Sequence, residues 1–239
     1  MEERQQAILA AVINEYTETV LPVSSNILAE KYDFDLSPAT IRFEMLELER
    51  RNYLYQPHTS AGRIPTDKGF RYFVDLLMEE KKLSLREQKI LRAGLLKSKI
   101  KNKMLVRTAI KLLSAMSENL AVGGIMDSND FYESGIKRLL SQPDFDNLES
   151  VTRVAEMIDY LMEGLGSFSF RWKKKSAAEI YIGSENPICG IEDCSIIISS
   201  CQLRSGQKGI LAIVGPKRMN YARNISLVDY IRRVLSGKL

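Results

Sequence analysis

The sequence predicts an α+β protein with a helical first half and a second half in which strands and helices are mixed. Apolar residues recur at helical spacing through most of residues 1–119. Three runs rich in β-branched residues, at 179–183, 194–203 and 209–214, are typical of strands. The chain has 239 residues, of which 45% are hydrophobic and 27% charged, the balance of a folded soluble protein.

A first helix is expected from Glu2 to Glu18, because its apolar residues form one stripe and Leu21-Pro22 follows as a stop. Ser24 or Ser25 is suited to cap a short second helix. A turn at 33–36 separates this pair from the next helix.

A third helix is expected to begin at Pro38, because Ser37 is a favourable N-cap and proline is tolerated at the first helical position. Asn52 is expected to end it. Its apolar spacing predicts a buried face of Ile41, Met45 and Leu48. Helical geometry then places the following residues outside, with Thr40 at the edge: Ala39, Arg42, Phe43, Leu46 and Arg50.

A short strand is expected at 53–55, followed by a polar arm from Gln56 to Pro65 and a fourth helix capped by Thr66. Three helices, a strand, an arm and a helix follow the order of a winged helix-turn-helix. In that motif the second helix of the pair enters the DNA major groove, and the arm, or wing, lies along the backbone or the minor groove.

This arrangement assigns two sets of DNA contacts. The residues expected to read bases are Ala39, Thr40, Arg42 and Phe43. The residues expected to hold the backbone are Ser37, His58, Thr59, Ser60, Arg63 and Lys68. Phe43 and Leu46 either contact thymine methyl groups or pack within the protein. His58 alternatively makes a local hydrogen bond, and Lys68 alternatively faces solvent alone.

Charge is unevenly distributed along the chain. Residues 1–80 hold eight Lys or Arg and fourteen Asp or Glu, a net charge of −6, whereas residues 81–111 hold eleven and one, a net charge of +10. The basic segment is interpreted first as a solvated helix face and second as a surface for flanking DNA. Residues 81–120 are expected to be helical, with Ser84 and Glu87 as a capping box and a bend near 99–103.

The second half is expected to hold a strand or junction at 121–127, a strand or turn at 130–135, a helix at 148–165, and a final helix capped by Ser226. Cys189, Cys194 and Cys201 are spaced for neither a disulfide framework nor zinc, and are expected to be buried thiols. No set of nucleophile, base and metal ligands has workable spacing, which predicts that the protein is not an enzyme and needs no cofactor.

The first residues, MEERQQAILAA, are polar and acidic, unlike a secretory signal or a transit peptide. No apolar run approaches the roughly 20 residues of a membrane-spanning helix. The sequence therefore predicts a cytoplasmic protein without a membrane partner.

Two stretches resemble the HrcA family of bacterial heat-inducible transcription repressors. The more specific one is QPHTSAGRIPTDKG, from Gln56 to Gly69, together with the helix SPATIRFEMLELER before it. The second comprises IGSENP from Ile182, DCS from Asp193 and GPKRMNYARNISLVDYI from Gly215, preceded by SQPDF from Ser141. The resemblance runs in collinear order over most of the chain.

This resemblance implies a homodimeric repressor on the inverted-repeat operator called CIRCE, upstream of chaperone operons, with the GroEL-type chaperonin as the partner that keeps it active. It implies a winged helix at 1–80, a basic helical linker at 81–120 and a reduced GAF-like regulatory or dimerisation domain at 121–239. Family chains run to about 340 residues, so this chain lacks roughly a domain, expected between residues 120–122 and Phe131.

Phe43 and Leu46 also depart from the family's usual helix, so the operator sequence stays open. The missing domain leaves the dimer surface open, and regulation by chaperonin or by a small ligand stays open as well. Two other functions remain: a winged-helix regulator of another operon that senses a small ligand, and a module whose winged helix docks on protein.

Overall fold

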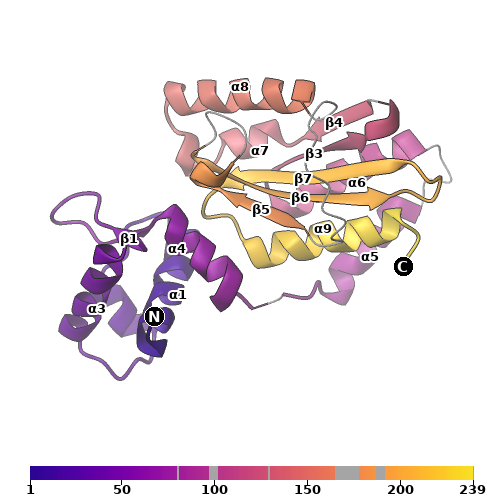
Figure 1. Ribbon diagram of the computed structural model, residues 1–239. Coiled ribbons are helices and arrows are strands. Elements are labelled where there is room, and N and C mark those ends of the chain that lie inside the picture. Colours follow the sequence, from indigo (N-terminus) through magenta and orange to yellow (C-terminus); the bar gives the residue numbers. More distant parts are fainter. Residues whose placement is uncertain (80, 97–101, 129, 165–177, 187–191, 239) are drawn as a thin grey trace. The chain divides into compact units, whose positions relative to one another are not determined.

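The computed structural model describes residues 1–79, 81–96, 102–128, 130–164, 178–186 and 192–238 (Figure 1). Its contacts divide the chain into two compact units. The N-terminal unit comprises Met1–Glu79 with Lys217–Asn220, and the C-terminal unit comprises Glu80–Pro216 with Tyr221–Leu239.

The N-terminal unit contains the helices, strands and π-helical turn in the order expected of a winged helix-turn-helix. They are α1 (Glu3–Thr19), α2 (Ser25–Lys31), α3 (Pro38–Arg50), β1 (Leu54–Tyr55), β2 (Ile64–Pro65), α4 (Asp67–Tyr72) and the π-helical turn η1 (Phe73–Leu77). β1 and β2 pair in antiparallel fashion, with Leu54 opposite Pro65. The connection between them is the wing.

Side-chain caps define the helix starts. Ser24 caps α2 by accepting from the Ile27 amide at 3.3 Å, which decides between the two serines expected there. Ser37 caps α3 and Thr66 caps α4, as expected, each accepting from the amide three residues later at 3.1 Å. Asn52, with φ 61°, has the left-handed conformation that ends α3.

The core of the N-terminal unit gathers the predicted apolar faces of its helices. Ile41, Met45 and Leu48 of α3 are buried, which confirms the expected inner face. The other core residues are Ile8, Leu9, Val12 and Ile13 of α1, Leu28 of α2, Leu54 of β1 and Phe70 of α4.

The C-terminal unit is a five-stranded antiparallel sheet with helices on both faces. Its helices are α5 (Leu85–Leu96), α6 (Asn102–Ser117), α7 (Ile136–Leu140), α8 (Leu148–Gly164) and α9 (Tyr221–Leu235), with short 3-10 turns at Met126–Ser128, Pro143–Phe145 and Gly183–Glu185. Its strands are β3 (Leu120–Ile125), β4 (Asp130–Ser134), β5 (Glu179–Ile182), β6 (Cys194–Gln202) and β7 (Lys208–Pro216).

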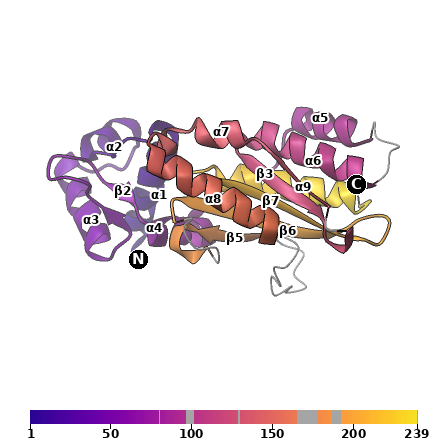
Figure 2. The ribbon, with the colours of Figure 1, turned by 90° about the horizontal axis from the view of Figure 1, so that it is seen from above.

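The strand order is β4-β3-β7-β6-β5, so β7 lies at the centre of the sheet. Alternate residues of the strands face opposite sides. One face packs against α8 through Val154, Met157 and Ile158. The other face packs against α6 and α9, and α5 packs on these two helices in turn. Figures 1 and 2 show α8 on one side of the strands and α9 on the other.

Close packing of α6 on the sheet requires a glycine in β3. A Cβ atom at Gly123 would lie 2.4 Å from the Ile210 carbonyl oxygen and 2.7 Å from Ile110 Cδ1. The small residue therefore allows both β7 and α6 to approach this strand.

The structure resolves and corrects several expectations for the second half. The segments at 121–127 and 130–135, each expected to be either a strand or a connection, contain most of strand β3 and all of strand β4. The final helix begins at Tyr221, five residues before Ser226, because Tyr221 and Asn224 continue its buried stripe. Ser226 lies inside that helix, where its hydroxyl donates to the Ala222 carbonyl at 3.0 Å. Helix α7 was not expected.

The capping box at the start of α5 is confirmed. The Ser84 hydroxyl and amide both donate to Glu87, and these hydrogen bonds hold the pKa of the Glu87 carboxyl below its usual range. Cys194 and Cys201 are buried, as expected, and burial raises the pKa of the Cys201 thiol to about 11. Cys189 and most of the bend expected at 99–103 lie outside the described residues. Within the described ranges, no helix is long and apolar enough to cross a membrane.

Replacing Ile213 tests the central strand. Its side chain is fully buried in β7, opposite Ile197 of β6. Because Ile213→Ala removes buried methyl groups and leaves a cavity, we expect it to lower the free energy of unfolding by about 2–5 kcal/mol. Ile90→Ala, at a half-exposed position of α5, should cost less than about 1 kcal/mol. Chemical denaturation followed by circular dichroism measures both, and equal losses would contradict this core.

Candidate nucleic-acid interface

The outer face of α3 presents a cation and an aromatic ring to solvent. Ala39 and Arg42 are exposed, and Phe43 is 58% exposed, so Phe43 does not pack into the core. Thr40 and Leu46 are half-buried. Within the described part of the chain, the Arg42 side chain makes neither a hydrogen bond nor an ion pair. The N-terminal half of α3 is therefore open to a ligand.

Ser37 and Thr40 form a small hydroxyl pair at the start of α3. Their oxygens lie 2.9 Å apart, and Ser37 also accepts from the Thr40 amide. Both expected contacts are thus part of the cap itself, and the exposed Ser37 lies at the helix end that an approaching groove would meet.

The tip of the wing is shaped by Gln56. Its side-chain amide donates to the Thr59 carbonyl at 3.0 Å and to the Ala61 carbonyl at 2.7 Å. These two bonds close the loop and leave His58, Thr59 and Ser60 exposed, as the sequence predicts. Sequence reasoning missed the part played by Gln56, which its place at the start of the arm could have suggested.

The base of the wing is fixed to the segment between α1 and α2. Val23 and Arg63 exchange two backbone hydrogen bonds of 2.9 Å. A Cβ atom at Gly62 would lie 2.4 Å from the carbonyl carbon and oxygen of Val23, so only glycine permits this approach. The wing is therefore held beside the start of α2.

Arg63 lies differently from the expectation that it enters a DNA groove. Its side chain is buried, with the residue 8% exposed, and Nε donates to Glu49 Oε2 at 2.9 Å. The guanidinium therefore ties the wing to α3. The backbone bridge to Val23 turns the side chain inward, and Glu49 on α3 supplies the charge that a buried guanidinium requires.

Lys68 is exposed, and its ammonium group has partners at the end of α3. Nζ donates to the Arg51 carbonyl at 2.8 Å and lies 4.4 Å from the centre of the Tyr53 ring. A cation at these carbonyls stabilises the C-terminal end of the helix.

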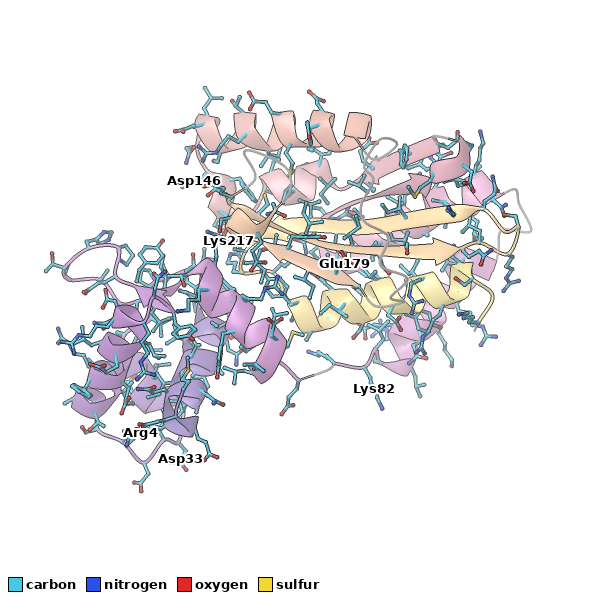
Figure 3. The ribbon with its side chains drawn as sticks, viewed as in Figure 1. Arg4, Asp33, Lys82, Asp146, Glu179 and Lys217 are labelled. Carbon is cyan, nitrogen blue, oxygen red and sulfur yellow. The ribbon has the colours of Figure 1, made fainter. Side chains whose placement is uncertain are left out.

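Two buried carboxylates join α1 to the helix pair. Glu44 of α3 is 3% exposed; it forms an ion pair with Arg4, labelled in Figure 3, and accepts from Gln5 Nε2 at 3.0 Å. Glu15 of α1 accepts from Lys31 Nζ at 2.6 Å and from the Tyr32 hydroxyl at 3.2 Å. The bond to Glu15 raises the pKa of Lys31, and burial together with the Glu15 charge raises the pKa of Tyr32 to about 12.

A polar groove of about 360 Å³ lies between α2, α3 and the wing. Its polar lining includes Ser25, Asn26, Arg42, Gln56, Thr59 and Ser60. No carboxylate lines it, although residues 1–80 carry a net charge of −6. The exposed acids Glu30, on α2, and Asp33, in the turn before α3 and labelled in Figure 3, do not line it.

The described residues of the basic segment at 81–111 are those just before α5, those of α5, and the first part of α6. Lys81, Lys82, Arg86, Lys89 and Arg92 are exposed, in keeping with a solvated face. Across the described ranges, no group of three or more His, Cys, Asp or Glu side chains is placed to hold a metal ion.

The family model and the curated relatives that match this chain agree on one family. Residues 71–225 match the family model described as the HrcA protein C-terminal domain. The heat-inducible transcription repressor HrcA of Desulforamulus reducens is 26% identical over 340 aligned residues, covering 100% of this chain and 97% of that protein. The protein of the same name from Carboxydothermus hydrogenoformans is 27% identical over 335, covering 99% and 97%.

One solved structure shares the fold. The crystal structure of a hypothetical protein superimposes with a TM-score of 0.82 at 20% identity, covering 99% of this chain and 98% of that one. The alignments are longer than the 239 residues of this chain, so they include positions where it has no residue.

Removing the Arg63 side chain tests its structural role. Arg63→Ala leaves Glu49 without its partner and detaches the wing from α3, so we expect the free energy of unfolding of the N-terminal unit to fall by about 1–3 kcal/mol. Thr59→Ala, at the exposed wing tip, should change it by no more than about 0.5 kcal/mol. Urea denaturation measures both variants. No loss on removing Arg63 would show that the ion pair does not hold the wing.

Proposed function

The chain belongs to the HrcA family, whose curated relatives are named heat-inducible transcription repressors, and from this membership we propose that it represses the transcription of heat-shock genes by binding DNA. The observation that carries this proposal is the open outer face of α3, where Arg42 has no partner within the described part of the chain and no carboxylate occurs from Leu36 to Phe43. A helix presented in this way fits the major groove.

The proposed contacts follow from the exposure of each side chain. Ala39, Thr40, Arg42 and Phe43 face base edges, with Leu46 beside a thymine methyl group. Ser37, His58, Thr59, Ser60 and Lys68 contact the backbone. Arg63 does not contact the DNA in this proposal. It is a positioning residue, because its bond to Glu49 holds the wing against α3.

The proposal includes three partners: an inverted-repeat operator of the CIRCE type, a second copy of this chain, and the GroEL-type chaperonin. A homodimer is proposed because one helix reads few base pairs and specificity requires a second half-site. The C-terminal unit supplies the dimer contact and the regulatory surface. The GroEL-type chaperonin is the proposed regulator. The protein acts in the cytoplasm, with no catalytic step.

Fluorescence anisotropy on a labelled CIRCE-type duplex and a scrambled duplex, over a salt series and with or without chaperonin, tests the proposal. A preference for the operator of about 10³-fold or more supports it, because that is the lower range for specific binders. Equal and steeply salt-dependent binding to both duplexes contradicts this operator but not DNA binding. No binding under any condition contradicts DNA binding itself.

Arg42→Ala should weaken operator binding by about 1–3 kcal/mol and relax the preference for the operator, because a bidentate contact to guanine would be lost. Arg50→Ala is the matched control on the same helix, since Arg50 Nη1 already pairs with Glu47 at 2.6 Å. It should leave the preference unchanged. Equal losses on operator and scrambled DNA for Arg42→Ala would show that Arg42 contacts phosphate rather than a base.

A further inference from the structure

The chain between β7 and α9 belongs by its contacts to the N-terminal unit. β7 ends at Pro216 and α9 begins at Tyr221, both in the C-terminal unit, whereas the four residues between them, Lys217–Asn220, are part of the N-terminal unit. We propose that this segment is a regulatory coupling element, through which a change in β7 or α9 alters the wing and the end of α3. The inference goes beyond the proposed function, because it concerns how one unit acts on the other and not what the N-terminal unit binds.

The side chains of the segment are anchored on α4 and α1. Lys217, labelled in Figure 3, forms an ion pair of 2.8 Å with Asp67, the first residue of α4. Arg218 Nη1 donates to the Thr17 carbonyl at 3.3 Å, in the last turn of α1. The last carbonyls of a helix have no partner within it, so this guanidinium supplies a donor where one is needed. Met219 is buried. Three consecutive residues therefore hold the segment.

The anchor on α4 leads directly to the end of α3. The hydroxyl of Thr66, the residue before the anchor, donates to the Asn52 carbonyl at 2.7 Å, and the left-handed Asn52 ends α3. A Cβ atom at Gly69 would lie 2.2 Å from the Tyr53 carbonyl oxygen, so α4 packs closely on the chain that follows α3. Because β2 ends at Pro65, directly before Thr66, the start of α4 also fixes the base of the wing.

The two ends of the segment are fixed on neighbouring residues of β6. Pro216 is paired with Cys194 in the sheet. The Tyr221 and Ser195 hydroxyl oxygens lie 2.8 Å apart, and both residues are buried. A connection of four residues between two such fixed ends has little slack. A displacement of β7 or α9 is therefore transmitted to the segment, as closely packed interiors transmit strain.

Hydrogen exchange followed by mass spectrometry measures this coupling without DNA. The reporter is the stretch 64–72, which comprises β2 and α4. The perturbation is Ile213→Ala, because Ile213 is fully buried in β7 and its truncation leaves a cavity beside the central strand. We expect exchange at 64–72 to become several-fold faster in the full chain, because local opening of these elements becomes less costly when their anchor loosens.

Removing the anchoring side chains should abolish this effect. In a chain that carries Lys217→Met and Arg218→Met, adding Ile213→Ala should no longer accelerate exchange at 64–72. The matched control carries Arg204→Met and Lys208→Met, which remove the same two charges at the other end of β7, where both residues are exposed. There the acceleration should persist. Exchange in β6 should rise with Ile213→Ala in all three backgrounds, because β6 pairs with β7 throughout.

Two results would overturn the coupling. Equal acceleration with and without the anchoring side chains would show that Ile213→Ala acts through global unfolding. Unchanged exchange at 64–72 in the otherwise wild-type chain, while exchange in β6 rises, would show that the segment transmits nothing. Ile213→Val, a smaller truncation, gives the same comparison if the alanine variant does not fold. Since no DNA is present, either result leaves the proposed function standing, and a failure to bind DNA leaves the coupling standing.

Discussion

The orientation of α3 depends on burying two carboxylates that cannot be buried without partners. Glu44 of α3 meets Arg4 and Gln5 of α1, while Glu15 of α1 meets Lys31 and Tyr32 at the end of α2. Apolar packing alone would tolerate small rotations of these helices. A rotation large enough to separate the charged pairs would leave a buried carboxylate unpaired, so the pairs limit how far these helices can turn. These contacts therefore help to fix the direction of the outer face of α3 and the shape of the groove beside it.

The elements of the N-terminal unit could be predicted from the sequence because the residues that begin and end its helices act locally. Ser37 followed by Pro38, Thr66 before α4 and the left-handed Asn52 each act within a few residues, and the structure has all three. The outer face of α3 followed from helical spacing once the buried face was known. Exposure of Ala39, Arg42 and Phe43 agrees with it. Whether these side chains contact bases depends on a partner that the sequence does not contain.

Predictions were less complete where a residue's environment comes from distant parts of the chain. The sequence predicts that Arg63 is an exposed residue of the arm. In the structure, the backbone bridge to Val23 directs its side chain inward, and the Glu49 carboxylate pairs with its guanidinium. Neither partner is a sequence neighbour of Arg63. The start of α9 was placed at Ser226 from its capping potential, but burial of Tyr221 and Asn224 extends the helix. The groove lining was missed for the same reason, since α2, α3 and the wing meet only in three dimensions.

The strand order of the C-terminal unit has a consequence for how its sheet can form. β3 with β4, and β6 with β7, are hairpins whose connections are short, at 126–129 and 203–207. Pairing of β3 with β7 instead joins residues that are 84 to 94 positions apart in the sequence, from Ile125 opposite Gly209 to Leu120 opposite Val214. Two hairpins can therefore form quickly from local contacts, and their docking along β3 and β7 carries most of the loop-closure entropy. We therefore expect pairing along β3 and β7 to limit the rate at which this sheet assembles.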